Sequence, residues 1–321
     1  HAHAVLADSM GAAGKYGPEI GYHCDGTPWF RVADYKLDGV RYEDSPFMDT
    51  QLRIKAMDKA GIDLQVLSPN PLSYFHFIED ADGIAFCRDH NDALAKEVSL
   101  YPARLAGLAA LPMQNIAAAI EELDRSVNSL GLLGAYIGTD FGIPLNDESL
   151  NPFYAALVSM NVPLFIHPAP AGIDGPVGDS NLNQFDLDLL TGFAAQETLA
   201  VATLIFGGVL EKFPTIDICI SHAGGGVAAL VGRLNQACLK RPWVPEFLQH
   251  EGAFEESLGR LWFDTHVHDT RVLDLVFKVM GSDRLVMGTN FSGWDQHALG
   301  INSEHQELFT KNAKRLLRAA L

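Results

Sequence analysis

The chain has 321 residues, of which 48% are hydrophobic and 20% charged, and 40 acidic side chains against 23 basic ones leave a formal net charge of -17. This composition is typical of a globular protein with one large or two ordinary domains. The acidic surplus repels phosphate backbones and anionic lipids, so we expect no nucleic-acid and no membrane partner. Four scattered cysteines without CxxC spacing indicate neither a disulfide framework nor a cysteine zinc site, and we expect a cytoplasmic protein.

Short apolar runs alternate along the chain with longer helical patterns. The runs predict strands buried on both faces of a parallel sheet, and they are Ile62–Ser68, Leu105–Leu111, Gly134–Gly138, Val162–His167, Ile216–Ser221, Leu261–Thr265 and Leu285–Gly288. Stretches with helical periodicity follow, and they are Thr50–Ala60, Asp80–Tyr101, Ile116–Ser129, Ser149–Met160, Leu187–Lys212, Gly226–Lys240, Thr270–Met280 and Glu304–Ala320. Such alternation predicts βαβ units throughout. A first strand upstream of His1 would complete a (β/α)8 TIM barrel, and an open doubly wound sheet is the alternative.

Two stretches rich in turn-forming residues interrupt this alternation. Residues 8–48 contain many Gly, Tyr, Pro and Trp residues and predict a loop with a small hairpin. Residues 169–186 are rich in Gly, Pro, Asp and Asn. Both follow strand ends that we place on one face of the barrel, after strands 1 and 5. We therefore predict a single α/β barrel domain over residues 1–321, with these two inserts as caps over the site.

Four of the twelve histidines have positions in the sequence that suggest one shared binding site. His1 and His3 are two residues apart, which places both imidazoles on one side of an extended chain. His167 and His222 each stand at the carboxyl end of a predicted strand. Barrel active sites are built at this end of the strands, and neutral imidazole is a suitable ligand for Zn²⁺, Mn²⁺ or Fe²⁺. The four histidines therefore predict a catalytic site for one divalent metal ion.

Several longer motifs resemble those of the amidohydrolase superfamily, and more narrowly those of the decarboxylase branch that contains 2-amino-3-carboxymuconate-6-semialdehyde decarboxylase. The superfamily orders its metal site as HxH at strand 1, one histidine at each of strands 5 and 6, and an acidic residue after strand 8. The resembling stretches are Leu52–Asp58, Gln65–Ser68, Leu108–Gln114, Phe206–Pro214, Ser221–Gly226, Val231–Arg233 and Val267–Asp269. The resemblance implies a (β/α)8 barrel with one divalent metal, usually zinc, and commonly a homodimer.

The same resemblance implies roles for individual residues. His1, His3 and His167 match the metal ligands of the family. His222 matches the acid/base that activates metal-bound water and relays a proton. A histidine suits this role because its pKa lies in the physiological range.

Two arginines and one tryptophan complete the predicted substrate site. Arg53 matches a family arginine that binds the substrate carboxylate, and Arg241 matches one that reaches the site of the neighbouring subunit. A planar guanidinium can form paired hydrogen bonds with a carboxylate, so these cations would attract an anionic substrate to an acidic protein. Trp294 is one of several aromatic residues that could face a flat unsaturated or aromatic ring.

Position 290 departs from the family pattern. Where the family has Gly-Thr-Asp-Tyr-Pro after strand 8, this chain has Asn290 in place of the aspartate that ligates the metal and pairs with the acid/base histidine. An amide oxygen can contact a metal, but it carries no charge and accepts no proton near neutral pH. Asn290 is either an engineered replacement of the aspartate, which the otherwise intact site favours, or a native residue. In the second case Asp295 or His297 would supply the group that is lost with the aspartate.

A second HxH pair, His266 and His268, stands at the predicted strand 7. The metal positions of the superfamily do not include this strand. We therefore expect a structural or supporting role for His268.

These features together predict a metal-dependent, non-oxidative decarboxylase that acts on a small anionic substrate, an aromatic or muconate-type carboxylic acid. The metal would stabilise the carbanion as CO2 leaves, and His222 would protonate the same carbon. A hydrolase that opens a lactone, an amide or an activated C–C bond is the alternative on the same scaffold. A native Asn290 would also favour a catalytically silent binding protein.

Overall fold

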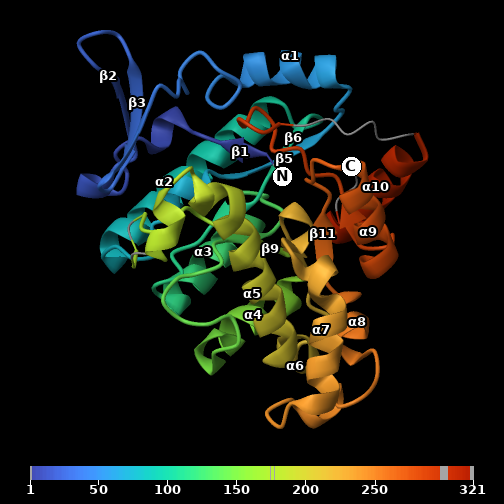
Figure 1. The fold of residues 1–321 in the computed structure, drawn as a ribbon. Coiled ribbons are helices and arrows are strands. Elements are labelled where there is room, and N and C mark those ends of the chain that lie inside the picture. The colour runs from blue at the N-terminus through green and yellow to red at the C-terminus, as the bar shows by residue number, and fades with distance from the viewer. Residues whose placement is uncertain (1, 174, 177, 297–302, 319–321) are drawn as a thin grey trace.

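The computed structural model describes residues 2–173, 175–176, 178–296 and 303–318. These residues form an α/β fold in which helices surround parallel strands (Figure 1). The parallel strands form two sheets, in the orders β1-β5-β6 and β12-β11-β10-β9-β8-β7. The sheets adjoin at Leu108, which separates β6 from β7 and donates its amide to the carbonyl of Leu67. Spatial neighbours therefore follow chain order, as successive βαβ units require.

The parallel strands are two to five residues long, and nearly all of their residues are buried. Their bounds are β1 (His3–Ala4), β5 (Gln65–Pro69), β6 (Leu105–Gly107), β7 (Ala109–Ala110), β8 (Ala135–Ile137), β9 (Leu164–Ile166), β10 (Ile218–Ile220), β11 (Trp262–Asp264) and β12 (Leu285–Val286). Each strand from β5 onward lies within a predicted run or extends one residue beyond it. Burial on both faces explains why these strands appear in the sequence as continuous hydrophobic runs.

An outer layer of helices covers the strands (Figure 1). These helices are α1 (Thr50–Ala60), α2 (Asp80–Leu100), α3 (Ile116–Asn128), α4 (Asn151–Met160), α5 (Phe193–Phe206), α6 (Val209–Lys212), α7 (Val227–Lys240), α8 (Ala253–Leu258), α9 (Thr270–Met280) and α10 (Ser303–Leu317). The single helix predicted over 187–212 is wrong in detail. A π-helical turn, η6 (Asp188–Gly192), precedes α5, and Gly208 in the left-handed conformation separates α5 from α6. Helix α8 is absent from the predicted elements, because six residues are too few for a clear helical period.

The first insert is larger than the predicted hairpin. It forms a three-stranded antiparallel sheet of β2 (Glu19–Tyr22), β3 (Pro28–Val32) and β4 (Tyr35–Asp38), at the upper left of Figure 1. Phe30 in β3 is buried in a separate small core with Phe75 and Phe86. The second insert, over 169–186, contains the 3-10 turn η5 (Ser180–Asn183) within its described part.

The first described strand already begins at His3. β1 pairs in parallel with Ser68 and Pro69, at the carboxyl end of β5. His1 lies outside the described residues, and the strand expected upstream of it stays a prediction.

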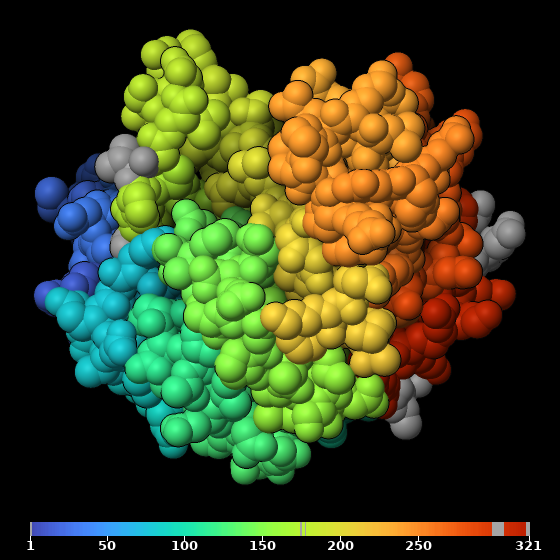
Figure 2. Space-filling model, turned by 90° about the horizontal axis from the view of Figure 1, so that it is seen from below, coloured from blue at the N-terminus to red at the C-terminus, as the bar shows by residue number. Residues whose placement is uncertain are grey.

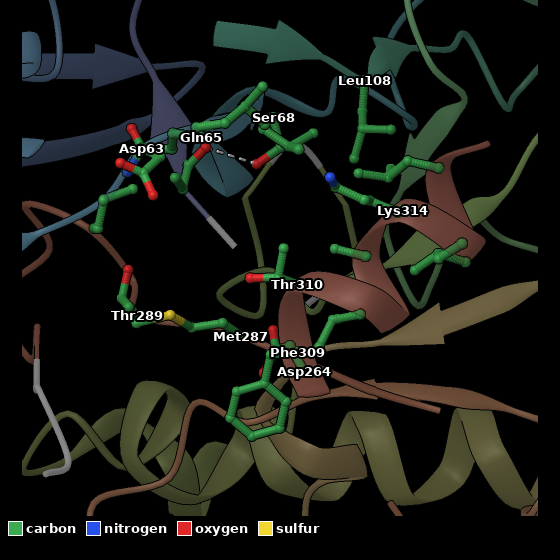
Figure 3. Close-up of a pocket in the computed structure, with 18 of the residues that line it drawn as sticks. Asp63, Gln65, Ser68, Leu108, Asp264, Met287, Thr289, Phe309, Thr310 and Lys314 are labelled. Carbon is green, nitrogen blue, oxygen red and sulfur yellow. Dashed lines mark hydrogen bonds between the residues drawn. The ribbon is translucent and has the colours of Figure 1, made fainter. Parts of the chain in front are cut away.

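A cavity of about 500 Å³ separates β5 from β12 and α10 (Figure 3). Ser68 and Asp264 line it from the strands, and Phe309 and Thr310 line it from α10. Within the described residues no backbone pairing joins β12 to β1. This cavity therefore lies between the two ends of the row of strands, with β1 and β5 on one side and β12 on the other.

The stretch Asp188–Phe206 has 19 residues and a hydropathy of 1.5, values that by length and composition alone would suit a membrane span. Its central residue, Glu197, is fully buried and contacts Ser221 and His222. A core helix that packs against the end of a strand can have the same length and apolar composition as a membrane span.

Candidate active site

A continuous row of imidazole rings crosses the carboxyl ends of the strands. The ring centroids of His3 and His167 lie 4.8 Å apart, and those of His167 and His222 lie 4.9 Å apart. The row continues from His222 to His266 at 5.3 Å and from His266 to His268 at 4.8 Å. The rings come from β1 and from the ends of β9, β10 and β11. Parallel strands end at one edge, and this edge brings together residues that are far apart in the sequence.

The Nδ1 atoms of His3 and His167 face backbone carbonyls. Nδ1 of His3 lies 3.0 Å from the carbonyl oxygen of Pro69, and Nδ1 of His167 lies 2.6 Å from that of Pro168. A carbonyl acceptor holds the proton on Nδ1, so Nε2 carries the lone pair, as in metal-ligating imidazoles. Burial lowers the pKa of His3 to about 3 and that of His167 well below its usual value, so both rings are neutral. This donor set fits a divalent cation.

A buried carboxylate orients His222. Its Nδ1 lies 2.6 Å from Oε1 of Glu197, and the Ser221 hydroxyl donates to the same oxygen. Burial raises the pKa of Glu197 well above its usual value, and burial lowers the pKa of His222. A carboxylate that holds one ring nitrogen positions the imidazole for proton transfer at the other. Glu197 is not among the predicted site residues, although it is the single charged residue between Phe193 and Phe206. A lone charge in an apolar helix is a recognisable signal.

A glycine turn brings His222 close to the helix that carries Glu197. Gly225 has a φ of +65°, and a Cβ atom there would lie 2.2 Å from the carbonyl oxygen of Ala194 in α5. Only glycine allows this conformation and this close approach of two backbones. The turn after β10 therefore sets the distance between His222 and Glu197.

A profile of the amidohydrolase family matches residues 1–319. The chain belongs to this amidohydrolase family. It is similar to the 2-amino-3-carboxymuconate-6-semialdehyde decarboxylase of Dictyostelium discoideum, with 30% identity over 298 residues that cover 91% of this chain and 80% of that protein.

Solved structures of amidohydrolase-type decarboxylases have the same fold. A 2,6-dihydroxybenzoate decarboxylase in complex with 2,6-dihydroxybenzoate is 26% identical, with a TM-score of 0.74 over 85% of this chain and 89% of that one. A dihydroxybenzoic acid decarboxylase from Polaromonas sp., with bound manganese and the inhibitor 2-nitroresorcinol, is 23% identical, with a TM-score of 0.72 over 87% of this chain and 90% of that one.

A second carboxylate, that of Asp295, lies close to Asn290. Asn290 has a φ of +42° and donates from Nδ2 to Oδ1 of Asp295 at 2.5 Å. Nε2 of His266 lies 3.1 Å from Oδ2 of Asp295. Burial opposes ionisation of Asp295, but hydrogen bonds with His266 and Asn290 outweigh it and hold its pKa at about 2. Asp295 thus lies beside Asn290, but that it supplies the group missing from Asn290 stays a prediction. His297 lies outside the described residues.

The predicted substrate residues lie in three different places. Arg53 is 2% exposed and donates to Oε1 of Gln65 at 2.6 Å and to the carbonyl of His3 at 2.7 Å. It therefore links α1 to β1 and β5. Trp294 is 74% exposed, in the loop next to Asp295. Arg241 follows α7 at the end opposite His222, about 20 Å away along the helix. The structure therefore does not bring Arg241 to the site of its own chain, and contact of Arg53 with a substrate stays a prediction.

Proposed function

We propose that this member of the amidohydrolase family is a metal-dependent, non-oxidative decarboxylase of a small aromatic or muconate-type carboxylic acid. The observation that carries the proposal is the position of His222, which Glu197 orients next to the neutral pair of His3 and His167. Membership of the family and the decarboxylases among its relatives support the same reaction.

His3 and His167 would hold the divalent ion, together with His1 and the side-chain oxygen of Asn290, whose parts follow from the family resemblance. The ion would supply a positive charge to the carboxylate and to the electron pair left behind by CO2. Zinc is the expected metal and iron is possible, while the manganese bound by the Polaromonas decarboxylase supports manganese as an option.

His222 would deliver the proton that the reaction consumes. As the bond between the ring carbon and the carboxylate breaks, CO2 leaves without the electron pair, and that carbon takes a proton from the imidazole. Glu197 would keep the ring in place through its contact with Nδ1. Trp294 could cover the flat face of the substrate, and Arg53 is the candidate cation for its carboxylate.

Four further features belong to this proposal. The strands close into a (β/α)8 barrel at the seam between β12 and β1, and the inserts 8–48 and 169–186 cap its mouth. Two copies form a homodimer, because Arg241 can serve only a neighbouring site. A cytoplasmic location agrees with four free cysteines, of which Cys87, Cys219 and Cys238 are buried.

Carbon dioxide release tests the proposed reaction. Metal-loaded protein is incubated with 2,6-dihydroxybenzoate and other hydroxylated benzoates, and CO2 and the decarboxylated product are measured in ¹⁸O-labelled water. We expect CO2 in equal amount to the product. Incorporation of ¹⁸O into the organic product without CO2 would indicate a hydrolase, and absence of any turnover would favour a binding protein.

Glu197→Gln tests the role of the buried carboxylate. We expect kcat to fall about 100-fold or more, because proton transfer by a positioned group contributes at least that much, while metal content stays unchanged. Glu122→Gln is the matched control, since Glu122 is a buried carboxylate that contacts Arg125 instead of a histidine. Equal loss of kcat in both folded variants would contradict the proposed role.

A further inference from the structure

A second cluster of metal-ligating side chains lies beside the proposed active site. His266 and His268 follow β11, and Asp295 lies in the loop after β12. One ligand atom from each of them lies within 4.8 Å of the other two. We infer that His266, His268 and Asp295 form a binding site for a second divalent cation. This inference goes beyond the proposed function, which assigns none of these three residues to its metal.

The distances between the donor atoms suit a small cation. Nε2 of His266 lies 3.1 Å from Oδ2 of Asp295. Nε2 of His268 lies 3.5 Å from the same oxygen and 3.0 Å from the backbone carbonyl oxygen of Asp295, a contact that a bound ion would replace. Donors that bind one ion at about 2.1 Å in a tetrahedron are ~3.4 Å apart. The two imidazole rings are inclined at 73°, so they approach the carboxylate from different directions. An ion between them would therefore require only small side-chain movements.

Supporting hydrogen bonds already hold two of the three ligands. The backbone amide of His266 donates to Oδ1 of Asp264 at 2.9 Å, which fixes the turn after β11. Asn290 donates to Oδ1 of Asp295 and leaves Oδ2 directed at the histidines. Such contacts behind the ligands are typical of metal sites, because they orient the donor atoms before the ion binds.

Burial also suits a site that exchanges its ion with solvent. The His266 side chain is 1% exposed and that of Asp295 is 15% exposed, whereas that of His268 is 51% exposed. His266 and Asp295 are therefore held within the protein, and His268 is in contact with solvent. His222 lies between this cluster and the pair of His3 and His167, so the two ions would stand on opposite sides of it.

Two imidazoles and one carboxylate define the class of ion. Imidazole suits zinc, copper, iron and nickel, whereas magnesium and calcium prefer sites made of oxygen atoms alone. Three protein ligands leave at least one coordination position for water or for a substrate oxygen. Zinc is the probe of choice, because its affinity for such a site exceeds that of manganese.

Zinc stoichiometry tests the second site directly. The full chain is stripped of metal with a chelator, loaded with excess ZnCl2, freed of unbound zinc by gel filtration and analysed by mass spectrometry. We expect about two zinc ions per chain, and about one in His268→Ala and in Asp295→Asn. His23→Ala is the matched control, because His23 forms a similar contact with Asp38, at 2.7 Å, on the antiparallel sheet. This control should keep both ions.

The outcomes separate this inference from the proposed function. His268 is half exposed, so its alanine variant should fold, which circular dichroism checks. A folded His268→Ala chain that holds as much zinc as the wild type would overturn the second site. His167→Ala should lose the ion of the proposed active site and keep the second one. Retention of both ions in His167→Ala would instead overturn the ligand assignment of the proposed function and leave the second site intact.

Discussion

The histidines of this protein differ in what their ring nitrogens contact. His3, His167 and His222 have an Nδ1 atom next to a backbone carbonyl or a carboxylate, which orients the ring for use at Nε2. His90 in α2 is 2% exposed, and its Nε2 has no hydrogen-bond partner in the described part of the chain. His3, His167 and His222 thus have the contacts of functional rings, whereas the burial of His90 without a partner for Nε2 should lower stability in acid.

His90 should make the folded protein sensitive to acid. Burial lowers its pKa from 6.5 to about 4. Above pH 6.5 the ring is neutral in the folded and unfolded chains, and stability is complete. As the pH falls below 6.5, the unfolded chain takes up a proton that the folded chain does not, until the pH reaches about 4. Each pH unit in this window costs about 1.4 kcal/mol of the free energy of unfolding.

When the pH falls from about 6.5 to about 5, we therefore expect the free energy of unfolding of the wild type to decrease by about 2 kcal/mol more than that of His90→Leu. Urea unfolding at both pH values measures the difference. His250→Leu is the control, since His250 is exposed and its replacement leaves the burial of His90 unchanged. Parallel pH dependence of the wild type and His90→Leu would refute this account.

At the scale of elements, the turn between β10 and α7 decides whether the site forms. His222 and Ala223 both have positive φ, at +44° and +52°, and Gly225 allows the turn to touch α5. Strained residues of this kind persist where the surrounding packing holds them, and they are frequent at functional sites. The close contact of the turn with α5 is what places Glu197 against His222.

Two glycines in this region should respond oppositely to alanine. Gly225→Ala adds a Cβ atom 2.2 Å from a backbone oxygen at a positive φ, so we expect the free energy of unfolding to fall by about 2 kcal/mol or more and kcat to fall with it. Gly232→Ala lies inside α7 with nothing within 4 Å of the new atom, and it should raise stability by about 0.5–1 kcal/mol. Thermal and urea unfolding measure both. A tolerated Gly225→Ala would show that the turn is not rigidly held.

At the scale of the whole molecule, the far end of α7 projects from the body. Figure 2 shows this segment, in orange, separated by a hollow from the yellow-green segment around residues 170–190. Leu239, Trp243 and Phe247 are 48%, 55% and 40% exposed there, next to Arg241. Apolar side chains that gather on a projecting surface are typical of protein–protein interfaces. The patch is therefore the surface that we expect to contact a second copy and to carry Arg241 toward its site.

Leu239→Asp should convert the expected dimer to a monomer, because a charge at an apolar interface must be desolvated without a partner. Leu100→Asp is the matched control, since Leu100 is 61% exposed at the end of α2. Light scattering after gel filtration measures the mass of each variant. A monomeric wild type, or a Leu239→Asp variant that stays dimeric, would rule out this interface.

The positions of the strands along the chain could be predicted from the sequence, because strands buried on both faces must consist of continuous apolar residues and the helices between them must be amphipathic. The histidines at strand ends were recognisable for the same reason, since each one breaks an apolar run at the edge where the strand leaves the core. Only the tertiary structure decided that Glu197 meets His222 and that Asp295 meets His266 and Asn290. These contacts join residues 25, 29 and 5 positions apart through turns with positive φ, whose geometry depends on packing against other elements and has no periodic signal in the sequence.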